Sequence, residues 1–173
     1  VGEIGDPEAL AMVTPGLEDA NRWVRVAAVE AVSKLSWRGD RQGLLALLPR
    51  LSDENWSVRE SALAAFAQVA QQGDDLAIAA VAVRLEDEFA SVRIAALQAI
   101  AEMVPPGSRE SMALVRLRLK DVDQDVRLEA IEALVAMSEN GDEDSIAALA
   151  RCAHDEREDE AVREAAESAV GRL

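Results

Sequence analysis

Aromatic and sulfur-containing residues are scarce in this sequence: it has no tyrosine, three tryptophans, two phenylalanines and a single cysteine. The lone Cys152 excludes an internal disulfide and a cysteine metal cluster, which favours a reduced, cytoplasmic setting. No apolar run approaches the roughly 18 residues needed to cross a bilayer, and no basic-then-apolar leader is visible. We therefore expect no membrane-spanning segment.

Basic residues are also few, because 18 Lys and Arg face 33 Asp and Glu, which gives a net charge of −15. Binding to a nucleic-acid backbone needs a basic footprint, and so does binding to an anionic membrane surface. The composition therefore predicts no nucleic-acid partner and no membrane partner. The acidity either attracts a basic protein segment or serves only solubility, and composition does not decide between these two interpretations.

One motif recurs along the whole chain: an aspartate, then a Val-Arg pair, then an alanine-rich apolar run. The aspartates keep a spacing of 34 residues, at Asp19, Asp53, Asp87, Asp121 and Asp155. The Val-Arg pairs keep the same spacing except the last, so two residues are inserted between Asp155 and Val162. A fixed period of this length is typical of a solenoid, in which each repeat buries its apolar face against its neighbours.

Each repeat contains two apolar segments at helical spacing. The second begins at the Val-Arg pair and continues in steps of three and four residues, as in Val92, Ala96, Ala99, Ile100 and Met103. A glycine precedes each first segment, and the Asp or Ser after it can cap a helix. We predict an all-α fold of five helix pairs at residues 6–36, 40–70, 74–104, 108–138 and 142–173, with residues 1–5 as the remnant of a preceding helix.

The period, the helix pairs and the Asp…Val-Arg…Ala pattern resemble HEAT repeats, particularly the short bacterial form related to bilin-lyase HEAT-like repeats. Pro15 and Pro49 lie one period apart inside first helices, where this family often carries a kinking proline, whereas Val83 and Leu117 replace it in later repeats. The resemblance covers essentially the whole chain. It implies a right-handed α-solenoid that forms a single domain over residues 1–173.

The paired Asp and Arg positions have a physical explanation. An arginine at the start of a helix is unfavourable against the positive end of the helix dipole unless an acid neutralises it. The aspartate of the same or the adjacent repeat can supply that acid, and in the resembling family such pairs form a ladder. We predict a ladder made of Asp19, Asp53, Asp87 and Asp121 with Arg25, Arg59, Arg93 and Arg127.

The sequence offers no convincing catalytic constellation. His154 with Asp155 could form half of a general-base pair, but it occupies a phase that is a polar turn position in other repeats. HEAT-like deoxyhypusine hydroxylases bind iron through His-Glu pairs, which this chain does not have, and HEAT-like DNA glycosylases need a basic groove. We find no phosphate loop, serine nucleophile motif or metal-ligand spacing. We therefore predict no catalytic residues, no metal and no cofactor.

The outer positions of the second helices are the best candidates for binding. They vary at fixed phase while the scaffold repeats, and several are apolar; in HEAT repeats this face lines the concave side. The alternative is a scatter of exposed apolar residues, which is ordinary. The candidate partner-binding residues are Val26, Glu30, Trp37, Glu60, Ile94, Gln98, Leu128, Glu132 and Val135.

These observations favour a non-catalytic scaffold for protein–protein interaction, with a protein or peptide partner that the acidic charge suggests is basic. The alternative is a bilin-lyase-type or other accessory enzyme subunit. Val1 has the phase of a core residue, and the first repeat has the apolar pattern of an interior one. We therefore expect the chain to continue a longer array and to associate end to end through its N-terminal face.

Overall fold

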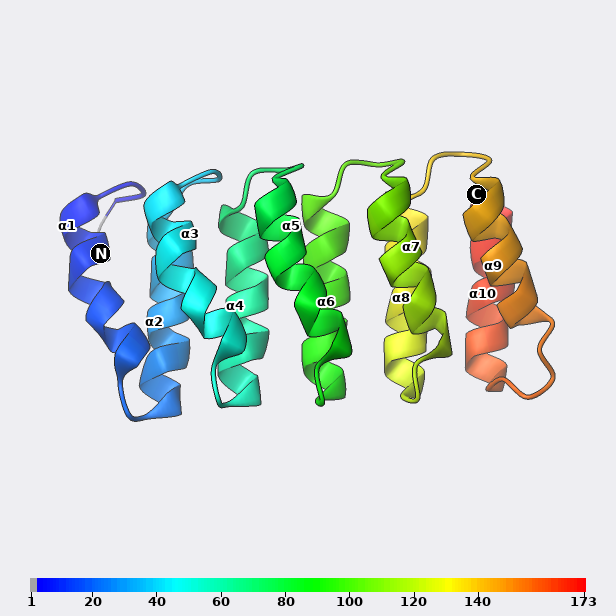
Figure 1. The fold of residues 1–173 in the computed structure, drawn as a ribbon, viewed down its shortest axis with the longest axis horizontal. Coiled ribbons are helices and arrows are strands. Elements are labelled where there is room, and N and C mark those ends of the chain that lie inside the picture. Colours follow the sequence, from blue (N-terminus) through cyan, green and yellow to red (C-terminus); the bar gives the residue numbers. More distant parts are fainter. Residues whose placement is uncertain (1–2) are drawn as a thin grey trace. The chain divides into compact units, whose positions relative to one another are not determined.

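The computed structural model describes residues 3–173, which contain ten α-helices and no strand (Figure 1). The all-α prediction is confirmed. The helices divide into two compact units, Val1–Met103 and Val104–Leu173, which are described separately below. A single-domain organisation stays a prediction, and the expectation for Val1 lies outside the described residues.

The N-terminal unit contains three helix pairs. Each first helix continues into a short 3-10 segment: α1 (Pro7–Val13) into η1 (Thr14–Glu18), α3 (Arg41–Leu47) into η2 (Leu48–Ser52), and α5 (Asp75–Ala82) into η3 (Val83–Glu86). The second helices are α2 (Arg22–Leu35), α4 (Trp56–Val69) and α6 (Ala90–Met103). Helix α4 packs between α2 and α6, so the second helices form one layer behind the first helices (Figure 1).

The C-terminal unit contains the remaining two pairs. The fourth repeat comprises α7 (Arg109–Leu117), η4 (Arg118–Lys120) and α8 (Gln124–Met137). The fifth comprises α9 (Glu143–Ala153) and α10 (Glu160–Arg172). Helix α10 packs against both α8 and α9, so within this unit the second helices again lie side by side.

The change from α-helix to 3-10 helix correlates with a buried leucine and not with the proline. Pro15 and Pro49 lie in η1 and η2, but η3 and η4 form without a proline. What the first four repeats share is a buried leucine in the 3-10 segment, namely Leu17, Leu51, Leu85 and Leu119. The fifth repeat has Ala153 at this phase, and α9 stays α-helical to that residue. We infer that the tighter 3-10 winding turns the leucine into the core.

A glycine turn closes each helix pair. Gly5, Gly39, Gly73, Gly107 and Gly141 all have φ between 78° and 89°, a conformation that side chains other than glycine rarely adopt. Each glycine N–H donates to the last turn of the second helix of its own pair, as Gly39 does to the Val69 carbonyl at 2.6 Å. The 34-residue spacing of the glycines therefore reflects a backbone requirement that recurs in every repeat.

Alanines set the spacing of the second helices. One alanine at the same phase is buried in each of the five repeats: Ala28, Ala62, Ala96, Ala130 and Ala166. Because a methyl group occupies so little space, the helices can approach closely along this line. Larger side chains such as Leu63, Leu97 and Ile131 are fully buried beside it and fill the core.

Gly43 in α3 provides a test of this packing. A Cβ atom at this position would lie 2.1 Å from Ser36 Oγ and 2.9 Å from Ser36 Cβ. Replacing a helical glycine with alanine normally stabilises a helix by about 1 kcal/mol. Here we expect Gly43→Ala to lower the free energy of unfolding by about 1 kcal/mol, because overpacking outweighs that gain. Urea denaturation measures the change.

The matched control is Gly43→Ala combined with Ser36→Gly, which removes the clashing atoms and should restore most of the lost stability. A single Gly43→Ala variant that is more stable than the original chain would contradict the packing argument.

Candidate partner-binding surface

The predicted Asp and Arg residues form an ion-pair ladder between successive repeats of the N-terminal unit. Arg25 donates from Nε and Nη2 to the two carboxylate oxygens of Asp53, at 2.9 and 2.8 Å. Arg59 binds Asp87 in the same way, at 2.8 and 2.7 Å. Each arginine therefore reaches the aspartate 28 residues ahead, in the next repeat, while the carboxylate of its own repeat is not its partner.

The third guanidinium nitrogen binds the turn of the arginine's own repeat. Nη1 donates to the backbone carbonyl of the preceding ladder aspartate in four repeats: Arg25 to Asp19, Arg59 to Asp53, Arg93 to Asp87 and Arg127 to Asp121. The aspartate thus has two separate functions. Its carbonyl orients the arginine of its own repeat, and in the N-terminal unit the carboxylates of Asp53 and Asp87 neutralise the arginine of the repeat before.

The two-residue insertion changes the ladder in the C-terminal unit. Arg127 donates to Glu158 Oε1 at 2.9 Å and to Asp159 Oδ2 at 2.6 Å. Asp155, which keeps the 34-residue spacing, instead accepts the backbone N–H of Arg157. The lengthened turn therefore supplies new carboxylates in place of the aspartate with the regular spacing.

A second row of arginines lies three residues before the ladder aspartates, and the sequence interpretation missed it. Arg50 donates to the Leu17 carbonyl at 2.7 Å and to Glu18 at 2.8 Å, and it lies 3.3 Å from Asp53. Arg84 lies 3.9 Å from Asp87. The period of 34 residues was the available signal, because Arg50, Arg84 and Arg118 obey it.

The ladder perturbs the protonation of Asp53. Burial raises the pKa of this carboxyl. The hydrogen bond from Arg25, the Asn55 N–H and the nearby Arg50 lower it by more than burial raises it, so the pKa lies below its ordinary value. The hydrogen bond that Arg25 donates to Asp53 also raises the pKa of Arg25. Both shifts favour the ionised pair in the folded chain.

This shift gives stability a pH dependence with a definite sign. A carboxyl whose pKa is lower in the folded state stabilises the fold above its unfolded pKa of about 4, and that contribution is lost as pH falls through the folded pKa. We expect the urea midpoint to fall on acidification below about pH 4. Asp53→Asn should be less stable at neutral pH but lose less stability on acidification. If the urea midpoint falls equally steeply with pH in both proteins, Asp53 is not the group responsible.

The predicted binding face of the N-terminal unit is partly packed. Val26, Glu60 and Ile94 are half-buried, whereas Glu30 and Gln98 are exposed. Between α2 and α4 this face has a hollow of about 210 Å³ lined by Glu30, Ser33, Lys34, Ser61, Ala64, Ala65 and Gln68. Ser33 donates a hydrogen bond of 2.6 Å to Gln68 across the two helices. The lining is therefore made of small and polar side chains, not of large apolar ones.

The remaining predicted face residues are placed differently. In α8 of the C-terminal unit, Leu128 and Val135 are half-buried and Glu132 accepts two hydrogen bonds from Arg172, at 3.1 and 2.8 Å. Trp37 lies at a glycine turn, because a Cβ atom on Gly5 would come within 2.6 Å of its ring. Its ring lies beside Gly5 and the residue is still 53% exposed, so a role for Trp37 in binding stays a prediction.

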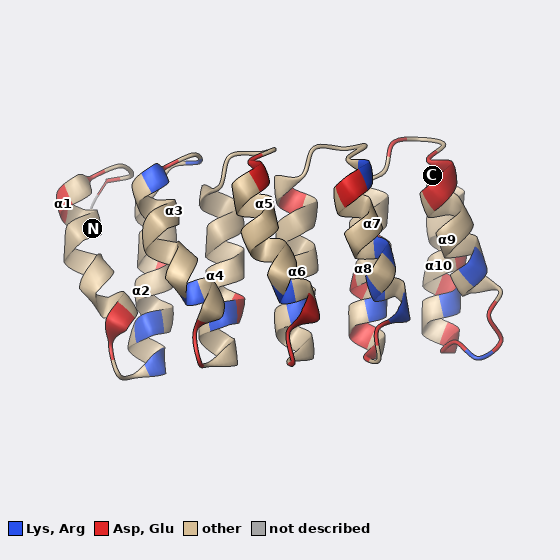
Figure 2. Ribbon diagram, viewed as in Figure 1, with Lys and Arg blue, Asp and Glu red and all other residues tan. Residues whose placement is uncertain are grey.

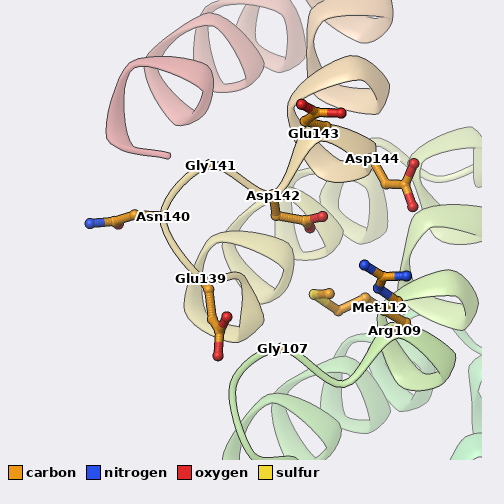
Figure 3. Close-up of a pocket in the computed structure, with 9 residues that line it drawn as sticks. All are labelled: Gly107, Arg109, Met112, Glu139, Asn140, Gly141, Asp142, Glu143 and Asp144. Carbon is orange, nitrogen blue, oxygen red and sulfur yellow. The ribbon is translucent and has the colours of Figure 1, made fainter.

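Other exposed features lie outside the predicted face. On the first helices, Leu45, Leu48 and Leu76 are exposed and line an apolar hollow of about 440 Å³. A polar hollow of about 480 Å³ in the C-terminal unit is lined by Arg109 and four acidic residues, and Asn140 points away from it (Figure 3). Within residues 3–173, no group of three or more His, Cys, Asp or Glu could hold a metal ion.

The residues considered for chemistry have ordinary surroundings. His154 is exposed at the end of α9, where Nδ1 lies 2.6 Å from the Ala150 carbonyl. Cys152 is half-buried, and burial raises the pKa of its thiol, so a smaller fraction of it is the reactive thiolate at neutral pH. None of the helices in the described part of the chain is long and apolar enough to cross a membrane.

Comparison with known proteins agrees with this geometry. The family model of HEAT repeats matches residues 1–67 and 78–171, and the chain belongs to that family. No curated protein sequence matches it. The narrower similarity to bilin-lyase-related repeats stays a prediction.

Several solved structures share the fold at low sequence identity. A designed armadillo repeat protein in complex with the peptide (KR)4 is 20% identical, covering 95% of this chain and 82% of its own, with a TM-score of 0.68. Armadillo repeat proteins computationally designed for modular peptide recognition are 20% identical over 96% and 82%, and an engineered protein is 19% identical over 94% and 78%, both with a TM-score of 0.62. The fold is that of an α-solenoid.

Proposed function

We propose that this chain is a non-catalytic scaffold that binds a basic segment of another protein on the face of its second helices. The observation that carries the proposal is the hollow between α2 and α4. There, exposed Ala64 and Gln68 leave room for a partner's side chains, and exposed Glu30 supplies a carboxylate, which lies 3.5 Å from Lys34 of the same hollow. Exposed small residues beside an accessible acid suit an extended segment that carries cations.

The charge of the chain supports a basic partner. With a net charge of −15, a cationic segment would be attracted before contact is made. The designed armadillo repeat protein that shares the fold is itself described in complex with the basic peptide (KR)4. We infer that the same class of ligand suits this chain, although the two proteins are only 20% identical in sequence.

The peptide (KR)4 is the probe for this proposal, and fluorescence anisotropy of a labelled peptide gives the affinity. Ala64→Arg places a cation in the hollow on an exposed helical position. We expect this variant to bind the peptide at least about tenfold more weakly, because like charges at an interface are repelled and the hollow is filled. Binding should also weaken as salt rises.

Ala11→Arg is the matched control, because Ala11 is an exposed alanine on the first helix α1 and the change in net charge is the same. An equal loss of affinity in both variants would mean that only the overall charge attracts the peptide. Failure of the unmodified chain to bind (KR)4 would overturn the proposal of a basic partner.

A further inference from the structure

Aromatic side chains gather at the edge where the second helices of the N-terminal unit begin. Trp23 lies in the first turn of α2, Trp56 is the first residue of α4, and Phe89 directly precedes α6. These are three of the five aromatic residues of the chain, and they are 61%, 39% and 40% exposed. Helices α2, α4 and α6 begin at the same edge, at the bottom of Figure 1. Most of the chain's few aromatic rings are thus presented to solvent.

Two of the rings already contact arginine side chains of the same chain. Trp56 and Phe89 stack with their centroids 6.0 Å apart and their planes inclined by 24°. The guanidinium carbon of Arg59 lies 5.6 Å from the centroid of Phe89, and that of Arg22 lies 4.8 Å from the centroid of Trp23. These distances are typical of cation–π contacts, so the edge has a geometry that accommodates guanidinium groups.

Phe89 occupies a position where folding favours another residue. Asn21 and Asn55 occupy the same place before α2 and α4, and each side chain accepts a backbone N–H of its helix. A phenyl ring cannot accept that hydrogen bond, and loss of such a cap typically costs about 1 kcal/mol. A residue that breaks a local folding rule and remains partly exposed points to a function at the surface.

Two acidic residues lie close to the rings in the sequence: Glu54 is two residues before Trp56, and Glu88 directly precedes Phe89. Glu54 and Glu88 directly follow the ladder aspartates, and their side chains are 87% and 78% exposed. Each lies near a ladder arginine, at 3.3 Å for Glu54 with Arg25 and 3.8 Å for Glu88 with Arg59. Both ladder arginine side chains are only 6% exposed, whereas Arg22 at the start of α2 is exposed. Acidic and basic residues therefore both lie near this edge, at the bottom of Figure 2.

We propose that Trp23, Trp56, Phe89, Glu54 and Glu88 form a second docking surface, called the aromatic edge, and that its occupant is an arginine-bearing segment of a partner protein. Each arginine would stack on a ring and donate to a neighbouring carboxylate. Packed helices lie about 8–10 Å apart, and an extended chain advances about 3.3 Å per residue. The segment would therefore carry arginines about three residues apart.

The probe is a peptide of four Arg-Ser-Ser repeats, compared with a peptide of the same composition whose four arginines are consecutive. The test variant is Phe89→Asn, which installs the residue that caps α2 and α4 and so should keep or raise the melting temperature. We expect the spaced peptide to bind the unmodified chain more tightly than the consecutive one. We expect Phe89→Asn to weaken the spaced peptide about tenfold, and Glu54→Gln with Glu88→Gln to weaken it further.

The control is Glu8→Gln with Asp75→Asn, two exposed acids at the glycine-turn edge of the same unit, which changes the net charge equally. Equal loss of affinity in this control, no effect of Phe89→Asn, or no binding to the unmodified chain would each overturn the aromatic edge. If Ala64→Arg abolishes binding of the spaced peptide while Phe89→Asn does not, the aromatic edge is wrong and the second-helix face stands. If the reverse holds, the aromatic edge is supported independently of that face.

Discussion

Replacing Arg59 with alanine is expected to lower the free energy of unfolding of the N-terminal unit by about 3–5 kcal/mol. The guanidinium makes a bidentate pair with Asp87 and a third bond to the Asp53 carbonyl. Without it, the Asp87 carboxylate, whose side chain is 4% exposed, would be buried with its main counter-charge removed. Tryptophan fluorescence during urea denaturation reports on this unit alone, because all three tryptophans lie before residue 104.

Two further variants separate the ion pair from general effects of losing an arginine. Arg22→Ala removes an exposed guanidinium that no carboxylate of the ladder binds, and should change stability by less than about 0.5 kcal/mol. Asp87→Asn in the Arg59→Ala background removes the carboxylate that has lost its main counter-charge and should recover part of the loss. If Asp87→Asn makes the Arg59→Ala variant still less stable, the buried charge is not the cause.

The second large effect is expected at the alanine line of the second helices. Ala62 is fully buried in α4, which packs against α2 and α6. A leucine there would insert three carbon atoms where helices meet through a methyl group, and we expect a loss of about 3 kcal/mol. Urea denaturation followed by tryptophan fluorescence measures it.

Ala64→Leu is the matched control, because Ala64 lies on the same helix and is exposed. It should change stability by less than about 0.5 kcal/mol. Equal destabilisation by both substitutions would show that helix α4 rejects leucine for reasons other than packing against its neighbours.

The repeating features of this chain were predictable because a constant spacing exposes them. The glycine turns recur every 34 residues, and so do the helix pairs and the alanine line up to the two-residue insertion before Val162. They recur because each repeat packs against its neighbours in the same way. The partner of each ladder arginine was not predictable. Asp53, six residues before Arg59, and Asp87, 28 residues after it, both follow the repeat period, so spacing does not choose between them. Only the folded structure shows that Arg59 binds the backbone carbonyl of Asp53 and the carboxylate of Asp87.

Features that break the period were hidden for the same reason. Trp23, Trp56 and Phe89 follow one another at 33 residues, one short of the period, so they occupy three different phases of the repeat although the fold brings them to one edge. The replacement of Asp155 by Glu158 and Asp159 was likewise invisible, because inserted residues have no counterpart in other repeats. The sequence pattern singled out proline as the residue that kinks the first helices, but the 3-10 segments share instead the buried leucine two residues after the proline position.

The ladder bond that spans 28 residues has a consequence for how such a chain can lengthen in evolution. A duplicated 34-residue stretch carries one ladder arginine and one ladder aspartate, wherever within the repeat the duplication begins. The new arginine finds an aspartate ahead of it and the new aspartate finds an arginine behind it, so no charge at the joint is left unmatched. Tandem copying of the gene segment therefore preserves the electrostatic match at the joint, whereas a gain of two residues, as before Val162, demands new acids within the same turn.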